Sequence, residues 1–286
     1  MRTLIDRLAG FGENPGGSFY SPIPSLKEVR RDEERIFDRS LRQLGGIELR
    51  QEEQLELLEE LGQFYGQQPF TEKPTAGARY FFDNGYFSYS DALLLYSMIR
   101  YAKPKRIIEI GSGYSSFVML DTSERFFDNS IQMTFIDPYP ERLQSRLTDN
   151  DLKTVNLIPK RVQDVDLERF SELGDGDILF VDSSHVSKVG SDLNHILFEI
   201  IPRLSKGVFV HFHDIHYPFE YHTEWILKRQ WFWNEAYILR AFLQYNSAFT
   251  VRIWNQFLGK HFPERVEKSM PLALKNPGGS LWIQRI

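Results

Sequence analysis

Ile107-Ile-Glu-Ile-Gly-Ser-Gly-Tyr-Ser-Ser116 places two glycines directly after an apolar strand and before a segment with helical character. Glycines at such a position let the backbone turn tightly and approach a ligand closely. The ligand then meets the free N–H groups at the beginning of the helix. We therefore expect Gly111, Ser112 and Gly113 to line a binding site.

Strands and helices alternate on both sides of this turn. The predicted strands are 106–110, 132–136, 154–158, 177–181, 207–212, 249–254 and 280–285. The predicted helices are 116–126, 141–147, 189–204 and 231–245, and residues 259–279 are expected to be irregular. Such alternation predicts an α/β fold: a Rossmann-like, doubly wound, mostly parallel sheet of seven strands with an antiparallel edge strand.

The chain before this core has a different character, which predicts two parts: an N-terminal helical extension (1–75) and the core (76–286). Residues 10–24 are rich in Gly, Pro and Ser, and helices are expected at 25–44 and 48–65. In the second helix Leu55, Leu58 and Leu61 recur at spacings of three, which is typical of one buried face. An aromatic loop follows at 80–89, after which Ser90 or Asp91 is expected to cap a helix.

Composition excludes several classes of function. The net charge is −5 and the chain has no long basic run, which argues against nucleic acid as a partner. The absence of cysteine excludes disulfides, thiolate metal sites and a Cys nucleophile. No run of about 18 apolar residues and no signal-peptide pattern occurs, so we expect a cytoplasmic protein without a membrane partner. We allow for a homodimer.

Acidic residues follow the strands at positions that suit a nucleoside ligand. Asp137 ends the second strand, where a carboxylate can accept both ribose hydroxyls. Asp164 follows the third strand and can take an adenine amino group, or else serve as a loop or cap residue. Glu109 would repel a pyrophosphate but suits a cationic amino-acid group. Ser116 stands where a dinucleotide fingerprint has Gly or Ala, which also argues against NAD.

Carboxylates and imidazoles follow the fourth and fifth strands. Asp182 and His185 follow one, and His213 and Asp214 follow the other. Because adjacent parallel strands end at the same edge, these side chains are expected to lie together. Such a set can hold a divalent ion, with Mg, Mn or Fe(II) favoured over structural zinc. Other histidines are expected to have no such role: His211 in the core, and His216 and His222 in a loop or at the rim.

Taken together, these motifs resemble class I S-adenosylmethionine (SAM)-dependent methyltransferases over about residues 85–286. The glycine turn resembles their nucleotide-binding motif, and Asp137, Gln163-Asp164 and the strand ending at Asp182 stand where their later motifs stand. The resemblance implies SAM as cofactor. Its expected contacts are Glu109, Gly111, Ser112, Gly113, Asp137, Gln163 and Asp164.

Among these enzymes the chain is similar to the branch that contains metal-dependent sugar O-methyltransferases of macrolide biosynthesis and cephalosporin hydroxylase-like proteins. The resemblance implies a divalent metal at Asp182 and Asp214, joined by His213, with His185 as the catalytic base beside Asp182. His213 stands where that branch commonly has Glu, which leaves the metal open among Mg, Mn and Fe.

The expected activity is methyl transfer to a hydroxyl of a small-molecule acceptor, a sugar or a glycosylated natural product. The aromatic loop 80–89 and the segment around Trp231 and Trp233 are expected to close over the ligands or, equally, to pack the extension on the core. Three alternatives stay open: an NAD-type oxidoreductase, a metal-dependent oxygenase-like enzyme, and a non-catalytic scaffold with the same fold.

Overall fold

A seven-stranded sheet forms the centre of the protein in the computed structural model, which describes residues 14–286. Its strands are β1 (Arg106–Ile110), β2 (Gln132–Ile136), β3 (Asn156–Ile158), β4 (Ile178–Val181), β5 (Phe209–Phe212), β6 (Phe249–Trp254) and β7 (Leu281–Arg285). They lie in the order β3-β2-β1-β4-β5-β7-β6. Neighbours among β1 to β5 pair in parallel, whereas β7 pairs antiparallel with β5 and with the edge strand β6. The predicted Rossmann-like fold is confirmed.

The inner parallel strands are buried on both faces, which explains their largely apolar sequences, whereas the edge strand β3 is partly exposed. All four residues of β4 and all four of β5 are buried. The chain runs outward from β1 first toward β3 and then, from β4, in the other direction, so β1 and β4 lie on either side of the point where the strand order reverses. Ligands of open α/β sheets bind at this point, beyond the carboxyl ends of the strands.

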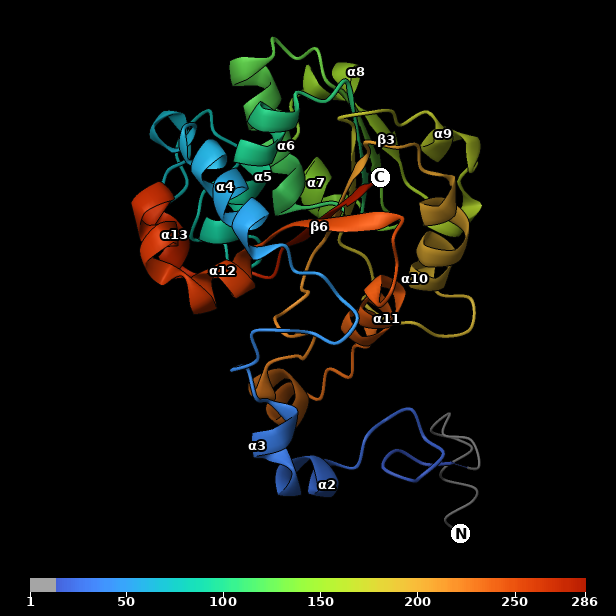
Figure 1. Ribbon diagram of the computed structural model, residues 1–286. Helices are drawn as coiled ribbons and strands as arrows, with labels where there is room; N and C mark the ends of the chain where they lie inside the picture. The colour runs from blue at the N-terminus through green and yellow to red at the C-terminus, as the bar shows by residue number, and fades with distance from the viewer. Residues whose placement is uncertain (1–13) are drawn as a thin grey trace.

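Helices cover both faces of the sheet. They are α2 (Leu26–Arg31), α3 (Glu33–Ile36), α4 (Gln51–Gly62), α5 (Tyr89–Ala102), α6 (Tyr114–Phe126), α7 (Glu141–Gln144), α8 (Asp151–Thr154), α9 (Glu168–Ser171), α10 (Asp192–His195), α11 (Glu235–Leu243), α12 (Asn255–His261) and α13 (Pro263–Ser269). The 3-10 helices are η1 (Tyr65–Gln67), η2 (Val162–Asp164), η4 (Ile201–Arg203) and η6 (Pro271–Lys275), and the π-helical segments are η3 (Ile196–Ile200) and η5 (Trp225–Arg229). Figure 1 shows α4, α5, α12 and α13 on one side of the sheet, and α9 and α10 on the other.

The N-terminal part differs from the expected pair of long helices. Residues 1–13 of the predicted extension lie outside the described residues. The helix expected at 25–44 is present only as α2 and α3, since Asp38 accepts a hydrogen bond from the Ser40 N–H at 2.8 Å and turns the chain after Ile36. Figure 1 shows α2 and α3 away from the sheet. By contrast, α4 buries its Leu face in the core, as predicted.

Three further expectations about elements were wrong. The segment expected to be irregular contains the end of α12 and all of α13, and Pro263 begins α13, a position where its missing N–H costs nothing. The helix expected from Trp231 begins only at Glu235. Asp91 does not cap α5, because its Oδ1 accepts hydrogen bonds from Ser280 and from the Gly279 N–H. In residues 14–286 no helix has the length and apolar character needed to cross a membrane.

Candidate functional site

Two neighbouring cavities lie at the carboxyl ends of β1, β2, β4 and β5. The larger measures about 880 Å³ and is lined by residues that include Gly111, Ser112, Asp137, Gln163 and Asp182. The smaller measures about 180 Å³, and its lining consists of Tyr86, Phe87, Ser112, Gly113, Tyr114, Ser115, Arg142, Asp182, His185, His213 and Asp214. Ser112, Arg142 and Asp182 line both. The predicted cofactor-binding residues and the predicted carboxylate–histidine cluster therefore adjoin at Asp182.

The glycine turn is held by contacts with two later strands. Gly111 has a φ of +83°, and a Cβ there would lie 1.8 Å from the carbonyl oxygen of Asp182, so only glycine fits. The Ser112 N–H and hydroxyl both donate to Asp137 Oδ2 at 2.8 Å. Asp137 Oδ1 accepts from the Tyr139 N–H at 2.8 Å. Asp137 thus shapes the turn and lines the cavity at once.

Glu109 lies beneath this turn and lines neither cavity. It is fully buried, and its two carboxylate oxygens accept hydrogen bonds from the hydroxyls of Ser115 and Ser116. Ser116 Oγ also accepts from the Gly113 N–H at 3.0 Å, which secures the beginning of α6. Burial raises the pKa of Glu109 to about 8. Its contacts support the turn, and direct ligand binding by Glu109 stays a prediction.

Gln163 and Asp164 face in different directions, and only Gln163 lines a cavity. Gln163 lines the larger cavity, and its Nε2 donates to the carbonyl of Gly190 at 2.9 Å. Gln163 Oε1 is buried without a protein partner. The Asp164 side chain is half exposed, lies outside the cavity lining and pairs with Arg161 at 2.8 Å. Of the two, Gln163 is therefore the residue placed to meet a ligand.

Asp182, His185, His213 and Asp214 come together as predicted. His185 Nε2 lies 3.3 Å from Asp182 Oδ1 and 3.7 Å from Asp214 Oδ2. His213 Nδ1 lies 3.4 and 3.7 Å from the same two oxygens. The two imidazoles thus face the two carboxylates across one small space.

The backbone at two of these residues adopts a conformation that non-glycine residues rarely take. His185 has a φ of +60° and Asp214 a φ of +56°. Gly279 allows the chain to pass here, since a Cβ at that residue would lie 2.9 Å from Asp214 Cα. Residues in such conformations gather at functional sites, where the surrounding structure has to hold them.

The site contains two more buried carboxylates, which sequence analysis did not assign to it. Glu235 Oε2 lies 2.7 Å from His185 Nδ1, and Asp91 Oδ2 lies 3.6 Å from His213 Nε2. Each therefore contacts the ring nitrogen that faces away from the small cavity. Asp91 lies in α5 and Glu235 begins α11, both far from the histidines in the sequence. No local pattern in the sequence pairs either carboxylate with its histidine.

The two imidazoles offset part of the negative charge of the carboxylates around them. Although burial opposes it, hydrogen bonds with Asp182 and Glu235 raise the pKa of His185 to about 10. Burial likewise opposes the charge on His213, yet Asp214 and Asp182 raise its pKa well above the usual value. Against the cost of burial, His213 and His185 lower the pKa of Asp182. The imidazoles therefore supply the positive charge that two close carboxylates require.

The other histidines have separate roles. His211 is buried, as expected, and its Nε2 pairs with Ser280 Oγ at 2.9 Å. His216 lies in a loop, one of the two expected positions, but it is only 3% exposed and contacts Gln256 Nε2 through Nδ1 at 2.6 Å. Its tight packing follows from Gly279, because a Cβ there would lie 3.1 Å from His216 Cε1.

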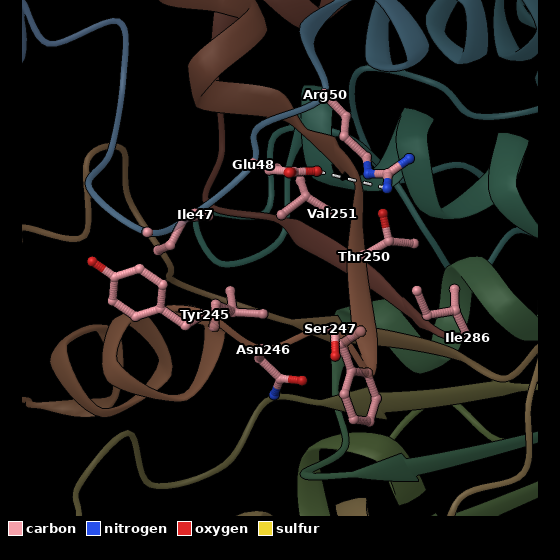
Figure 2. A pocket seen from close by; sticks show the side chains of 12 residues that line it. Ile47, Glu48, Arg50, Tyr245, Asn246, Ser247, Thr250, Val251 and Ile286 are labelled. Atoms are coloured by element: carbon pink, nitrogen blue, oxygen red, sulfur yellow. Dashed lines mark ion pairs between the residues drawn. The ribbon is translucent and has the colours of Figure 1, made fainter.

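A separate cavity of about 520 Å³ lies between residues 46–50 and the edge strand β6 (Figure 2). Its lining includes Ile47, Tyr245 and Val251, together with the pair Glu48–Arg50, whose charged atoms are 3.8 Å apart. No predicted site residue lines it. The chemistry of the lining residues therefore singles out the two adjoining cavities above β1 and β4 as the candidate active site.

Comparison with known proteins agrees with this placement. A family model described as a methyltransferase domain matches residues 108–215, which span β1 to β5 and every member of the four-residue cluster. The chain belongs to the class I SAM-dependent methyltransferases. This methyltransferase is also 41% identical, over 162 residues, to an uncharacterized protein of Archaeoglobus fulgidus, a stretch that covers 56% of this chain and 73% of the relative.

Solved structures similar to the methyltransferase are distant. One is the O-methyltransferase TomG from Streptomyces achromogenes, involved in tomaymycin synthesis and solved with SAM: identity is 14%, coverage 90% of this chain and 96% of TomG, and the TM-score 0.44. Another is the Podospora anserina methyltransferase PaMTH1 with S-adenosylhomocysteine (SAH) bound, with 15% identity, coverage of 68% and 77%, and a TM-score of 0.43. The family model and the fold, rather than these likenesses, assign the methyltransferase.

The predicted metal site stays a prediction. Within residues 14–286, no group of three or more His, Asp or Glu side chains is arranged so that it would hold a metal ion as it stands. His185 and His213 lie within 3.7 Å of both carboxylates and can supply positive charge to them without an ion. His213 Nδ1 is nonetheless buried without a hydrogen-bond partner and faces both carboxylates, so the donor set suits a cation as well as a proton.

Proposed function

We propose that this methyltransferase transfers a methyl group from SAM to a hydroxyl of a small molecule, a sugar or a glycosylated natural product. One observation carries the proposal: His185 Nε2 faces the small cavity, which shares Asp182 with the larger one. An imidazole beside the boundary of two ligand cavities is the arrangement that proton removal from an acceptor requires.

The larger cavity suits the cofactor. We assign the ribose hydroxyls to Asp137, the adenine to the region of Gln163, and the amino-acid end to the backbone of Gly111 to Gly113. SAM, when bound, supplies an electrophilic methyl group on a positively charged sulfur. The chain has to align the acceptor oxygen with that methyl group and accept its proton, and proximity and orientation alone account for much of such a rate enhancement.

His185 is the proposed proton acceptor, and the charge of the site explains how it can act. Hydrogen bonds with the carboxylates Asp182 and Glu235 raise its pKa to about 10, so the imidazole is protonated in the ligand-free protein. A bound cationic cofactor would offset part of this negative charge and would lower that pKa. His185 Nε2 would then accept the proton that the acceptor hydroxyl loses on methylation, and the positive charge lost by the methyl donor would be matched by one on the imidazole.

Asp182, Asp214 and His213 are the residues we propose to hold a divalent ion, which would polarise the acceptor hydroxyl. The unpartnered His213 Nδ1 and the carboxylate oxygens 3.4 and 3.7 Å from it support this. Imidazole in the set favours Mn or Fe(II) over Mg. Without an ion, these side chains and His185 form the imidazole–carboxylate cluster described above.

The walls of the small cavity suit a ring-shaped acceptor. Tyr86 and Phe87 of the predicted aromatic loop line it, and the Arg142 guanidinium stacks on the Tyr86 ring at 4.2 Å. The Trp233 ring lies 4.4 Å from the His185 ring and stacks with Trp231. Aromatic faces of this kind bind sugars and planar rings.

The proposal is tested with SAM labelled in its methyl group and a panel of glycosides, polyols and phenols. We expect label on an oxygen of at least one acceptor with the wild-type protein. His185→Gln should bind SAH with unchanged affinity by calorimetry but transfer label at least about 100-fold more slowly, the scale of a lost general base. Transfer only to nitrogen or carbon, or absence of SAH binding by the wild type, would refute the proposal.

A further inference from the structure

Glu235 is buried where a carboxylate is costly. It begins α11, it is 1% exposed, and its Oε2 lies 2.7 Å from His185 Nδ1, the ring nitrogen opposite the one that faces the cavity. Its other oxygen, Oε1, is buried without a hydrogen-bond partner. Acidic residues at a helix beginning are commonly stabilised by the helix dipole. An exposed side chain would have that benefit too, so the dipole does not explain why this carboxylate turns inward.

The backbone around Glu235 holds the same histidine. The N–H groups of Asn234 and Glu235 both donate to the carbonyl of His185, at 3.1 and 3.2 Å. The Asn234 side chain accepts from the Ser187 N–H at 2.6 Å and donates to the Ser187 carbonyl at 3.1 Å. The beginning of α11 is therefore docked on residues 185–187 by four hydrogen bonds, and it supports the unusual positive φ of His185.

The contact with Glu235 decides which nitrogen of His185 is available. A carboxylate can only accept, so Nδ1 has to carry a proton. The nitrogen left for chemistry is Nε2, which lies 3.3 Å from Asp182 and 3.7 Å from Asp214 in the small cavity. The Trp233 ring, 4.4 Å away, limits rotation of the imidazole.

We propose that Glu235 is a positioning residue, which keeps the proton of His185 on Nδ1 and directs Nε2 at the acceptor oxygen. The proposal rests on the proposed function of His185 as base and adds to it the residue that orients this base. The logic is that of an acid–histidine pair, in which a buried carboxylate selects the tautomer without itself touching the substrate.

A direct test follows the Nδ1 proton by NMR in protein labelled with ¹⁵N-histidine. Because this proton is hydrogen-bonded to a buried carboxylate, it should give a downfield, slowly exchanging ¹H signal, assigned through its absence in His185→Gln. We expect the signal in the wild type and in the control Glu220→Gln, which changes a nearby carboxylate that accepts from Tyr237 and does not contact His185. In Glu235→Gln it should move upfield or disappear, while SAH affinity stays within about twofold.

Steady-state kinetics complete the test, with an acceptor to which the wild-type protein transfers the labelled methyl group. Glu235→Gln should lower kcat by about 10² to 10⁴-fold with little change in KM, because orientation and proton transfer are lost but binding is not. Should Glu235→Gln not fold, Glu235→Asp retains the charge at a greater distance and should show a weakened signal and an intermediate kcat. An unchanged Nδ1 signal in the folded variant, or a lost signal with unchanged kcat, would overturn the proposal. The NMR result does not depend on methyl transfer, so a wrong assignment of the reaction is recognised separately.

Discussion

Gly111 packs directly beneath the main-chain carbonyl of Asp182, at a separation that leaves no room for a Cβ atom. The contact follows from the sheet, because β1 and β4 are neighbours whose last residues, Ile110 and Val181, are paired. The glycine turn and the first residue of the carboxylate–histidine cluster are thus one structural unit. A change at either residue should affect both cavities.

Gly111→Ala should destabilise the protein by at least about 2 kcal/mol and abolish SAH binding, because it combines a positive φ with a steric overlap. Gly66→Ala is the matched control: its φ is not positive, and no atom lies within 4 Å of where its Cβ would be. Urea unfolding and calorimetry with SAH measure both effects. Equal losses in the two variants would contradict the assigned role of Gly111.

Asp137→Ala should weaken SAH binding by at least about tenfold, near 1.4 kcal/mol, since charge-assisted hydrogen bonds to a ribose would be lost. Asp164→Ala should leave the affinity unchanged, because that carboxylate pairs with Arg161 outside the cavity lining. Calorimetry compares the two. A loss in Asp164→Ala but not in Asp137→Ala would reverse this assignment.

Glu109 should make the stability of the ligand-free protein depend on pH. Its pKa is raised from the ordinary 4.5 to about 8, so the fold favours the protonated form. The resulting stabilisation is complete below pH 4.5 and is lost as the pH rises toward 8, on the order of 1.4 kcal/mol per pH unit at most. Glu109→Gln should therefore show a flatter profile of Tm against pH between 5 and 8.5. Parallel profiles for the two proteins would show that Glu109 does not titrate in this window.

Removal of divalent ions tests the metal proposal. EDTA should abolish methyl transfer, and Mn or Fe(II) should restore it at least as well as Mg, because His213 replaces an oxygen ligand. Asp182→Asn should be nearly inactive yet still bind SAH. Full activity in EDTA would show that the imidazole–carboxylate cluster works without an ion.

Truncation tests how far the N-terminal part belongs to the core. We expect a chain beginning at Asp38 to fold and bind SAH, because α2 and α3 lie away from the sheet (Figure 1). A chain beginning at Ala76 should not fold, since α4 contributes Leu55, Leu58 and Leu61 to the core and Gln54 Oε1 accepts from the Trp254 N–H at 2.9 Å. Thermal melting followed by circular dichroism would reveal either result. A stable chain from Ala76 would support an independent core domain.

Local rules were sufficient for the elements near the site. Apolar runs that end at Gly111 and at Asp137 placed β1 and β2 with their observed bounds, because strand length and burial are local properties of a parallel sheet. The bounds predicted for the antiparallel edge strand β6 were also correct. The convergence of Asp182 with Asp214 also followed from sequence, since adjacent parallel strands end at one edge. Sequence analysis missed two local signals: the turn at Asp38, which follows the shortened helix, and Pro263, which begins α13.

The sequence by itself determined the fold class, the glycine turn, and the grouping of two carboxylates with two histidines, because each depends on strand ends and backbone freedom. Only the tertiary structure decided which way side chains face: Glu109 and Asp164 away from the cavities, Gln163 into one. It alone brought Glu235 to His185 and Asp91 to His213, across 50 and 122 residues. No local pattern encodes such pairs, because their distance is set by how α5 and α11 pack against the sheet.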